Sequence, residues 1–562
     1  MSSPQAASPP ETSSSQIGMW DAVSIIVGII IGATIFESPP DIFNAMPEKW
    51  TVATHTYTIS AAWTGMGAWL LVGILSLIGA LCYAELGTAY PTTGGDYTYI
   101  SRAYGHGPGF LFAWAEMSII RTGGSITIMA YVFATYAERL LKTVNPSALE
   151  SLGSHSRLIL AGSPIILLTL VNAVGLRPGK WTQNLLVFVK VVGLLGIIVS
   201  GFLFFLWPTK ADQVVQKESF GWDRPSYALA LVFLFYAYGG WNEAAYVAGE
   251  LRNRRRNMIL ALMIGVGAVT LIYLAVNGAY LAALGLNRVR ASDAIAADVM
   301  TLSLGSRGAM AISILIIIST LGAINGLLFC GIRLYSNFGE HERLFAWLSR
   351  KTFGSVPLGA LLIQTFFSLG LIVLFETTDF WKPWLADQLK LILPYLNMTL
   401  PKNFTGKPQG FKDVVACTAP VFWLFFTLTG FSLMVLRSRD PNRERPFKVP
   451  LYPILPIVFC LSSLFMLYKS TDYAFTKGPA EIMIVVIFLL LGIPLYAFSG
   501  PVSAKPSSVD WGERLLCAAP YPLPSRFFCF AAQIPPARRR RKKPTFACSF
   551  PPRIPSSKCK AS

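Results

Sequence analysis

Long apolar segments, separated by short polar loops, run through most of the chain. Twelve of them have the length that a membrane-spanning helix needs, about 20 residues for a hydrocarbon layer of roughly 30 Å. The pattern predicts an all-α polytopic membrane protein, with spans numbered 1 to 12 in chain order. They are expected at residues 20–36, 63–88, 109–136, 158–174, 182–206, 226–249, 258–284, 309–336, 357–376, 414–436, 451–468 and 480–498.

The composition agrees with this fold class. Hydrophobic residues make up 53% of the 562 residues and charged residues only 14%, whereas soluble domains are about 25% charged. So high an apolar content excludes a chain that is disordered throughout. A single water-soluble domain is also unexpected at this length and hydropathy.

Polar sequence marks the two ends of the chain. We expect an N-terminal tail at residues 1–17, a membrane domain at 18–500 and a basic, disordered tail at 501–562, which holds 12 of the 47 Lys and Arg residues. An even number of spans places both termini on one side of the membrane. The loops on that side have the higher density of Lys and Arg, so we expect the termini in the cytoplasm and the spans in a plasma membrane or bacterial inner membrane.

The sequence lacks the motifs of common enzymes. It has no Walker A loop, no Gly-x-Ser-x-Gly and no His-Glu-x-x-His. The four histidines fall outside the predicted spans, and no cysteines have the spacing of a metal site. We therefore expect no enzyme activity, no metal, no cofactor and no nucleic-acid partner, and a lipid bilayer as the surroundings.

Two spans contain small residues at corresponding positions. Span 1 carries Gly28 and Gly32, and span 6, five spans later, carries Gly239 and Gly240. A glycine inside a helix is unfavourable by about 1 kcal/mol relative to alanine. One interpretation is that these glycines let helices pack closely. The matched positions favour another, a five-plus-five inverted repeat in which spans 1 and 6 are broken.

A broken helix exposes backbone polar groups inside the bilayer. Because those groups need partners, such a break must line a polar cavity. The half-helix after a break presents N–H groups and a positive dipole end to an anion, and the half-helix before it presents carbonyls to a cation. A free α-amino acid carries both charges on one carbon, so we predict an amino acid site between spans 1 and 6.

Several charged residues lie inside the predicted spans. Lys190 is about eight residues into span 5, roughly 12 Å deep at ~1.5 Å per residue, and a charge at that depth is a functional candidate. Arg121 in span 3 needs a partner, but Glu116, five residues earlier, is not on the same face of an α-helix. Arg333 is expected to anchor span 8 at the interface, and Glu243 is expected to face the inner vestibule.

Five stretches carry more specific sequence patterns. They are Ile29–Pro39 (IIIGATIFESP), Tyr83–Tyr99 (YAELGTAYPTTGGDYTY), Phe235–Glu250 (FYAYGGWNEAAYVAGE), Ser319–Arg333 (STLGAINGLLFCGIR) and Arg445–Pro450 (RPFKVP). These stretches resemble the amino acid–polyamine–organocation (APC) superfamily, and within it the L-type-like, sodium-independent amino acid permeases. The resemblance covers about residues 18–500. It implies a transporter domain with a five-plus-five inverted repeat, two extra helices and alternating access.

The resemblance also implies a substrate site at the two breaks. The substrate carboxylate would meet backbone N–H groups of span 1, and the ammonium would meet carbonyls of both spans, with an aromatic gate over the substrate. The N–H groups are those of Gly32, Ala33 and Thr34; the carbonyls lie near Ile30, Ile31, Tyr236 and Ala237; Tyr236 is the gate and Tyr238 belongs to the same aromatic lining.

The resemblance further implies a role for the buried lysine. Lys190 matches a lysine that takes the place of a sodium ion in sodium-independent relatives, with Ser319 and the broken span 1 as expected neighbours. Its ammonium either stays charged or loses its proton during the cycle. One departure is that the family usually has Gly-Ser-Gly where this chain has Gly-Ala-Thr, so Ala33 removes a hydroxyl and Thr34 adds a branched side chain.

Together these observations predict a secondary transporter of neutral L-amino acids, sodium-independent, working by exchange or proton symport. Neutral substrates are expected because span 10, from Val421 to Val435, is apolar and uncharged. Two alternatives stay open: an amino acid-sensing transceptor, and a transporter of cationic amino acids or polyamines that uses Glu116 or Glu243. Residues 137–157 contain no cysteine, so no disulfide-linked heavy chain is expected.

Overall fold

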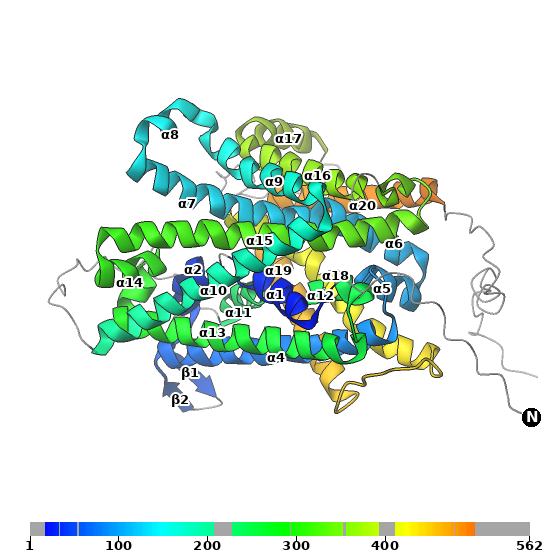
Figure 1. Cartoon of the computed structure of the whole chain (residues 1–562), viewed down its shortest axis with the longest axis horizontal. Helices are drawn as coiled ribbons and strands as arrows, with labels where there is room; N and C mark the ends of the chain where they lie inside the picture. The colour runs from blue at the N-terminus through cyan, green and yellow to red at the C-terminus, as the bar shows by residue number, and fades with distance from the viewer. Residues whose placement is uncertain are drawn as a thin grey trace, which may run out of the picture. The chain divides into compact units, whose positions relative to one another are not determined.

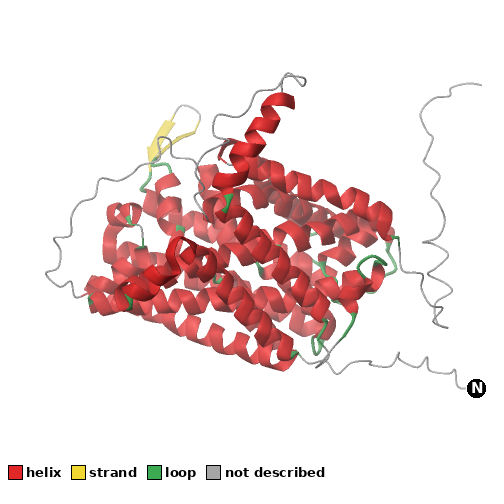
Figure 2. Ribbon diagram, turned by 90° about the horizontal axis from the view of Figure 1, so that it is seen from above, coloured by secondary structure: helices red, strands yellow, loops and turns green. Residues whose placement is uncertain are grey.

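A computed structural model of the chain describes residues 17–32, 34–52, 55–206, 227–292, 294–351, 356–392, 411–477 and 479–500. This part of the chain is almost entirely helical (Figure 1). It also contains one antiparallel hairpin, β1 (Lys49–Val52) and β2 (His55–Thr58), in which Lys49 pairs with Thr58 (Figure 2). Ala33 and both predicted tails, except Ile17, lie outside the described residues.

Among the described residues, eleven helices are long and apolar enough to cross a membrane. They match every predicted span except span 6, so the prediction of an all-α polytopic membrane fold is confirmed. Nine of these spans are formed mainly by one helix each. In order, spans 2, 4, 5, 7, 8, 9, 10, 11 and 12 are α4 (Ala61–Ala89), α9 (Ser156–Val174), α10 (Leu176–Leu206), α13 (Arg254–Ala291), α15 (Ser306–His341), α16 (Leu358–Glu376), α18 (Phe411–Arg439), α19 (Ile454–Lys477) and α20 (Pro479–Ser499).

Spans 1 and 6 are both broken, as predicted. Span 1 consists of α1 (Met19–Ile30) and α2 (Thr34–Glu37), with α3 (Pro39–Ala45) after it. Span 6 consists of four short pieces, none of which is long enough to cross a membrane alone. They are α11 (Tyr227–Ala237), the 3₁₀ turn η4 (Trp241–Glu243), α12 (Ala244–Val247) and the 3₁₀ turn η5 (Ala248–Glu250).

Span 3 is an α-helix interrupted by π-helical turns. It runs through α6 (His106–Ala115), the π-helical η1 (Glu116–Ile120) and η2 (Thr122–Thr127), and α7 (Ile128–Val144). The Arg121 N–H donates to the Glu116 carbonyl at 3.1 Å, a bond across five residues where an α-helix has four. The Thr127 hydroxyl donates to the Thr122 carbonyl at 2.7 Å, which helps to satisfy the widened ladder. Such turns occur frequently at functional sites.

Short elements that the apolar pattern did not predict occupy the connections between the spans. Besides the hairpin and α3, they are α5 (Asp96–Tyr104), α8 (Pro146–Leu152), the 3₁₀ turn η3 (Gly153–His155), α14 (Ile295–Leu304), the 3₁₀ turn η6 (Ala346–Ser349) and α17 (Thr378–Ile392).

Burial separates the central spans from the outer ones. In the apolar window of each helix, 83% of residues are buried in span 3 and 72% in span 8, against 28% in span 5 and 22% in span 12. The outer helices expose large side chains such as Phe366 and Phe498, a surface that suits lipid and not water. α15 packs against α1, α7 and α10 (Figure 1), so the core lies around the two broken spans.

Candidate functional site

The two breaks lie against each other because of one glycine. Gly240, just after α11, has φ +111°, in the left-handed region that favours glycine. A Cβ atom at Gly240 would lie 2.6 Å from Cγ2 of Ile29 in α1. Any larger residue would therefore both strain the backbone and push the two broken spans apart.

Lys190 lies on α10 and reaches the break in span 1. Its side chain is fully buried. The Nζ atom donates to the carbonyl of Gly28 at 2.8 Å and also to the carbonyl of Ile31. These carbonyls belong to the last turn of α1 and to the residue after it, where the helical ladder leaves acceptors without partners. Lys190 therefore supplies hydrogen bonds to the unwound backbone.

Ser319 on α15 approaches the same backbone from the other side. Its hydroxyl lies 3.3 Å from the carbonyl oxygen of Ile31 and 3.1 Å from that of Gly32. On the α10 side, Gly28 allows α1 and α10 to approach closely. A Cβ atom at Gly28 would lie 2.3 Å from Nε2 of Gln183 in α10. The structure thus brings Lys190, Ser319 and the broken span 1 together.

Tyr273 on α13 connects the two breaks, and the sequence analysis missed it. Its hydroxyl lies 2.9 Å from the carbonyl oxygen of Ile30 and 3.1 Å from that of Ala237. The side chain is fully buried. The available signal was a phenol near the middle of a membrane span, since a buried tyrosine hydroxyl usually has a hydrogen-bond partner.

A cavity of about 100 Å³ lies beside the two breaks. A water molecule needs roughly 10–15 Å³ of such space, so the cavity has room for a small organic molecule. Polar groups of span 3 and span 6 share the wall with apolar and aromatic side chains of spans 1, 3, 6, 8 and 10. Among its lining residues are Ile29, Ile30, Thr34, Ile120, Met129, Val232, Phe235, Tyr236, Asn242, Leu327, Val415, Phe422 and Trp423.

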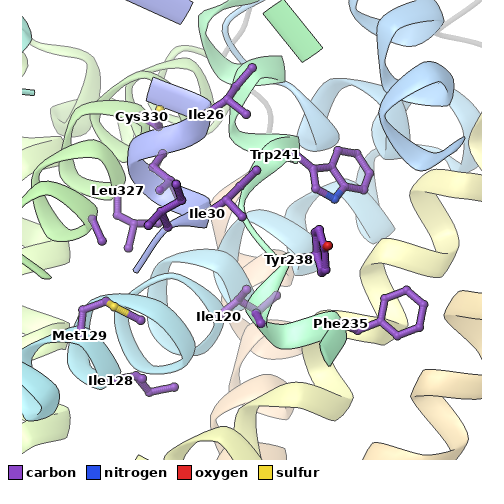
Figure 3. Close-up of a cluster of buried hydrophobic side chains, with 14 of the residues drawn as sticks. Ile26, Ile30, Ile120, Ile128, Met129, Phe235, Tyr238, Trp241, Leu327 and Cys330 are labelled. Atoms are coloured by element: carbon purple, nitrogen blue, oxygen red, sulfur yellow. The ribbon is translucent and has the colours of Figure 1, made fainter. Parts of the chain in front are cut away.

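Not every residue that the sequence indicated lines this cavity. Ile30, Thr34 and Tyr236 do, whereas Ile31, Gly32, Ala237 and Tyr238 are absent from its wall. The Tyr238 hydroxyl donates to the Trp69 carbonyl at 3.0 Å. Figure 3 shows Tyr238 and Trp241 on the side of the span 6 ribbon away from Leu327 and Met129.

The carbonyls expected to receive an ammonium already accept hydrogen bonds. The Ile30 oxygen accepts from the Gly32 N–H at 2.8 Å as well as from Tyr273, and the Ile31 oxygen accepts from both Lys190 and Ser319. The Gly32 N–H, expected to meet a carboxylate, is therefore used within the chain. In span 6, the Tyr236 carbonyl accepts from the Gly239 N–H at 3.0 Å.

Arg121 forms a buried cluster with two glutamates of the cavity wall. Its Nη2 atom lies 2.8 Å from Oε1 of Glu116, and Nη1 lies 2.7 Å from Oε2 of Glu243. Nη1 also donates to the carbonyl of Leu327 at 3.2 Å. All three side chains are buried. We call Glu116, Arg121 and Glu243 the triad.

The triad corrects two expectations. Glu116 and Arg121 were expected on different faces of an α-helix, but the π-helical turn η1 places residues five apart above one another. Glu243 was expected in the inner vestibule, but it lines the cavity together with Glu116. Both differences arise because the local backbone is not α-helical at these points.

Arg333, expected to anchor span 8 at the interface, forms an ion pair with Glu250. Its guanidinium binds the Glu250 carboxylate through two hydrogen bonds of 2.8 Å, and its side chain is only 6% exposed. This geometry ties α15 to the end of span 6.

Comparisons with known proteins agree with this architecture. Residues 17–493 match the family described as amino acid permease. The chain is 28% identical over 493 residues to the b(0,+)-type amino acid transporter 1 of Mus musculus, covering 86% of this chain and 87% of that protein.

Two further relatives from Mus musculus show the same degree of similarity. The large neutral amino acids transporter small subunit 2 is 28% identical over 528 residues, and the Asc-type amino acid transporter 1 is 28% identical over 520 residues; each match covers 90% of this chain and 86% of the relative. The family and these relatives are permeases and transporters, not enzymes. Because the family match extends over most of its length, the chain belongs to the amino acid permease family, within the APC superfamily.

Proposed function

We propose that the chain is a secondary transporter of neutral L-amino acids that works by alternating access and without sodium. The observation that carries this proposal is the cavity beside the two helix breaks. Most of its wall is aliphatic or aromatic, from Ile29, Ile120, Phe235, Leu327 and Trp423 among others. Such a wall stabilises an apolar side chain by burial.

The backbone of the breaks receives the two charges of the substrate. We propose that the carboxylate binds near Thr34, which lines the cavity. We propose that the ammonium binds near the Tyr236 and Ala237 carbonyls. Each accepts a hydrogen bond from within the chain, from the Gly239 N–H and the Tyr273 hydroxyl, and keeps a second lone pair for the substrate. The Ile30 and Ile31 carbonyls each accept two such bonds. Tyr236 acts as a gate, and its hydroxyl donates to the Gly124 carbonyl of span 3 at 3.1 Å.

Substrate class is tested by competition in liposomes that contain the purified chain. Excess leucine, phenylalanine, alanine and methionine are expected to displace a labelled neutral amino acid during counterflow, because their side chains fit the apolar wall. Arginine and glutamate are expected not to displace it. Strong inhibition by arginine that disappears in Glu116→Gln or Glu243→Gln would contradict the proposed substrate class.

A second candidate, a transporter of cationic amino acids or polyamines, is favoured by one observation. Glu116 and Glu243 both line the cavity, and Arg121 supplies only one positive charge between them. The same competition experiment decides between the two candidates.

Sodium independence is the second expected result. Replacing sodium with choline at constant osmolarity and membrane potential should leave the initial uptake rate unchanged, because the Lys190 ammonium already binds the carbonyls of span 1. Strong stimulation by sodium would refute it.

We also propose that the chain acts without a disulfide-linked heavy chain, since residues 137–157 contain no cysteine, and that its termini face the cytoplasm.

A further inference from the structure

We propose that the triad of Glu116, Arg121 and Glu243 is a proton-binding site that couples amino acid uptake to inward proton movement. The inference rests on the proposed transport function and deepens it by choosing proton symport over exchange. It assigns the proton to a pair of carboxylates in the cavity wall and leaves Lys190 as a fixed charge.

The first argument is the charge of the triad. Two carboxylates and one guanidinium leave one negative charge uncompensated when all three are ionised. The side chains are 4%, 1% and 5% exposed for Glu116, Arg121 and Glu243. An unpaired charge buried at this depth is strongly unfavourable. A proton on one of the two carboxylates makes the triad neutral. The protonated carboxyl group still has one oxygen that can accept a hydrogen bond from the guanidinium.

The second argument is the surroundings of the triad. Among the described residues, Arg121 is the only cation found next to the two carboxylates. Its guanidinium lies over the Tyr246 ring at 5.1 Å, and the Tyr335 hydroxyl donates to the Glu116 carbonyl at 3.2 Å. α1 carries one ionisable residue, Asp21, which pairs with Lys180. The other ionisable side chains that face the triad are Tyr246 of α12, Tyr335 and Cys330 of α15, and Asp96 of α5. Of the neighbouring elements, α4 contributes Tyr83, which contacts the Trp241 ring, and α13 contributes Tyr273, which binds the Ala237 carbonyl.

The third argument is access. Glu116 and Glu243 line the cavity that receives the substrate, whereas Lys190 is absent from its wall. A proton can therefore reach and leave the carboxylates through the same space as the amino acid. The Lys190 ammonium binds two carbonyls of span 1, and loss of its proton would weaken both hydrogen bonds because they would no longer be charge-assisted.

The coupled step needs no other reactant. In the outward-open state, a proton from the outer solution binds one carboxylate oxygen of the pair, and the neutral triad then faces a neutral amino acid. After the change of access, the O–H bond breaks and the proton leaves to the inner solution. One proton crosses with each amino acid, and both carboxylates are ionised again before the next cycle.

The test uses the full chain in proteoliposomes with the membrane potential clamped. An inward gradient of one pH unit supports about tenfold accumulation of a neutral amino acid if one proton crosses with it. The unmodified chain is expected to accumulate labelled leucine, phenylalanine, alanine or methionine, whichever counterflow shows to be transported best. Glu243→Gln and Glu116→Gln each fix one carboxylate position as neutral, so they are expected to show counterflow but no accumulation above the outside concentration.

Two variants serve as controls. Glu250 lies in the same span as Glu243, but its carboxylate is paired with Arg333 and does not line the cavity. Glu250→Gln is expected to keep the response to the gradient. Glu243→Asp keeps a carboxylate at this position and is also expected to keep the response to the gradient. Size-exclusion profiles show whether each variant folds; if Glu243→Gln does not, Glu116→Gln and a pH-sensitive dye inside liposomes with the unmodified chain provide the test.

The outcomes are distinct. Counterflow by the unmodified chain without gradient-driven accumulation overturns the proton site and leaves the transport proposal standing. Accumulation that persists in Glu243→Gln and in Glu116→Gln also overturns it. Uptake of arginine that needs no gradient shows that a cationic substrate supplies the missing charge, and again overturns it. No counterflow with any amino acid refutes the proposed function itself.

Discussion

Lys190→Met is expected to abolish most transport while the protein still folds and reaches the membrane. Methionine has a similar length and suits the buried position, but it cannot donate to the Gly28 and Ile31 carbonyls. Each hydrogen bond to a charged group contributes about 1.5–3 kcal/mol, so we expect the loss of two of them to lower uptake by roughly 100-fold or more. The measurement is the initial uptake rate per amount of folded protein in liposomes.

Lys180→Met is the matched control on the same helix. Lys180 pairs with Asp21 at 3.1 Å, but its side chain is 29% exposed. Because partly exposed pairs contribute about 1 kcal/mol or less, a rate reduced by no more than about fivefold is expected. Equal losses in the two variants would show that Lys190 has no special role in holding the unwound part of span 1.

Arg121→Met is expected to be the most destabilising single substitution in the triad. It removes the cation between Glu116 and Glu243 and leaves two buried carboxylates without a partner. Removing one member of a buried ion pair is unfavourable by about 3–5 kcal/mol. We expect a large drop in the unfolding temperature of the detergent-solubilised protein, together with loss of uptake.

Two comparisons make the Arg121 result specific. Arg157→Met removes an arginine that is 43% exposed and 3.7 Å from Glu376, so it should change the unfolding temperature little. Adding Glu116→Gln and Glu243→Gln to Arg121→Met removes the uncompensated charges and should recover part of the lost stability. If the triple variant is no more stable than Arg121→Met, charge is not the cause of the instability.

The fold could be predicted from the sequence because membrane helices have a strong and simple signal. A run of apolar residues of sufficient length implies a span whatever its neighbours are. The breaks could also be predicted, since Gly32, Gly239 and Gly240 weaken the helix at matched positions. Lys190 stood out because a lysine so deep in a bilayer needs an acceptor, and the unwound end of α1 provides it.

The triad could not be predicted because it depends on hydrogen-bond register. The pairing of Glu116 with Arg121 requires a π-helical turn, and residue spacing alone does not show whether a carbonyl bonds four or five residues ahead. Glu243 joins them only because the 3₁₀ turn η4 follows the left-handed Gly240. The bond from Tyr273 to both breaks is likewise a long-range contact that no local pattern contains.

The π-helical turn of span 3 also determines where that span can change its length during evolution. Deleting one residue of a membrane α-helix normally turns everything after it by about 100°, because each residue advances the helix by that angle. Between Glu116 and Arg121, a deletion would instead convert the turn to an α-helical one. The two side chains would then be four residues apart, a spacing that still allows an ion pair, and α7 would keep its orientation. Homologous sequences that differ by one residue within Glu116–Ile120 are therefore compatible with the same packing of span 3.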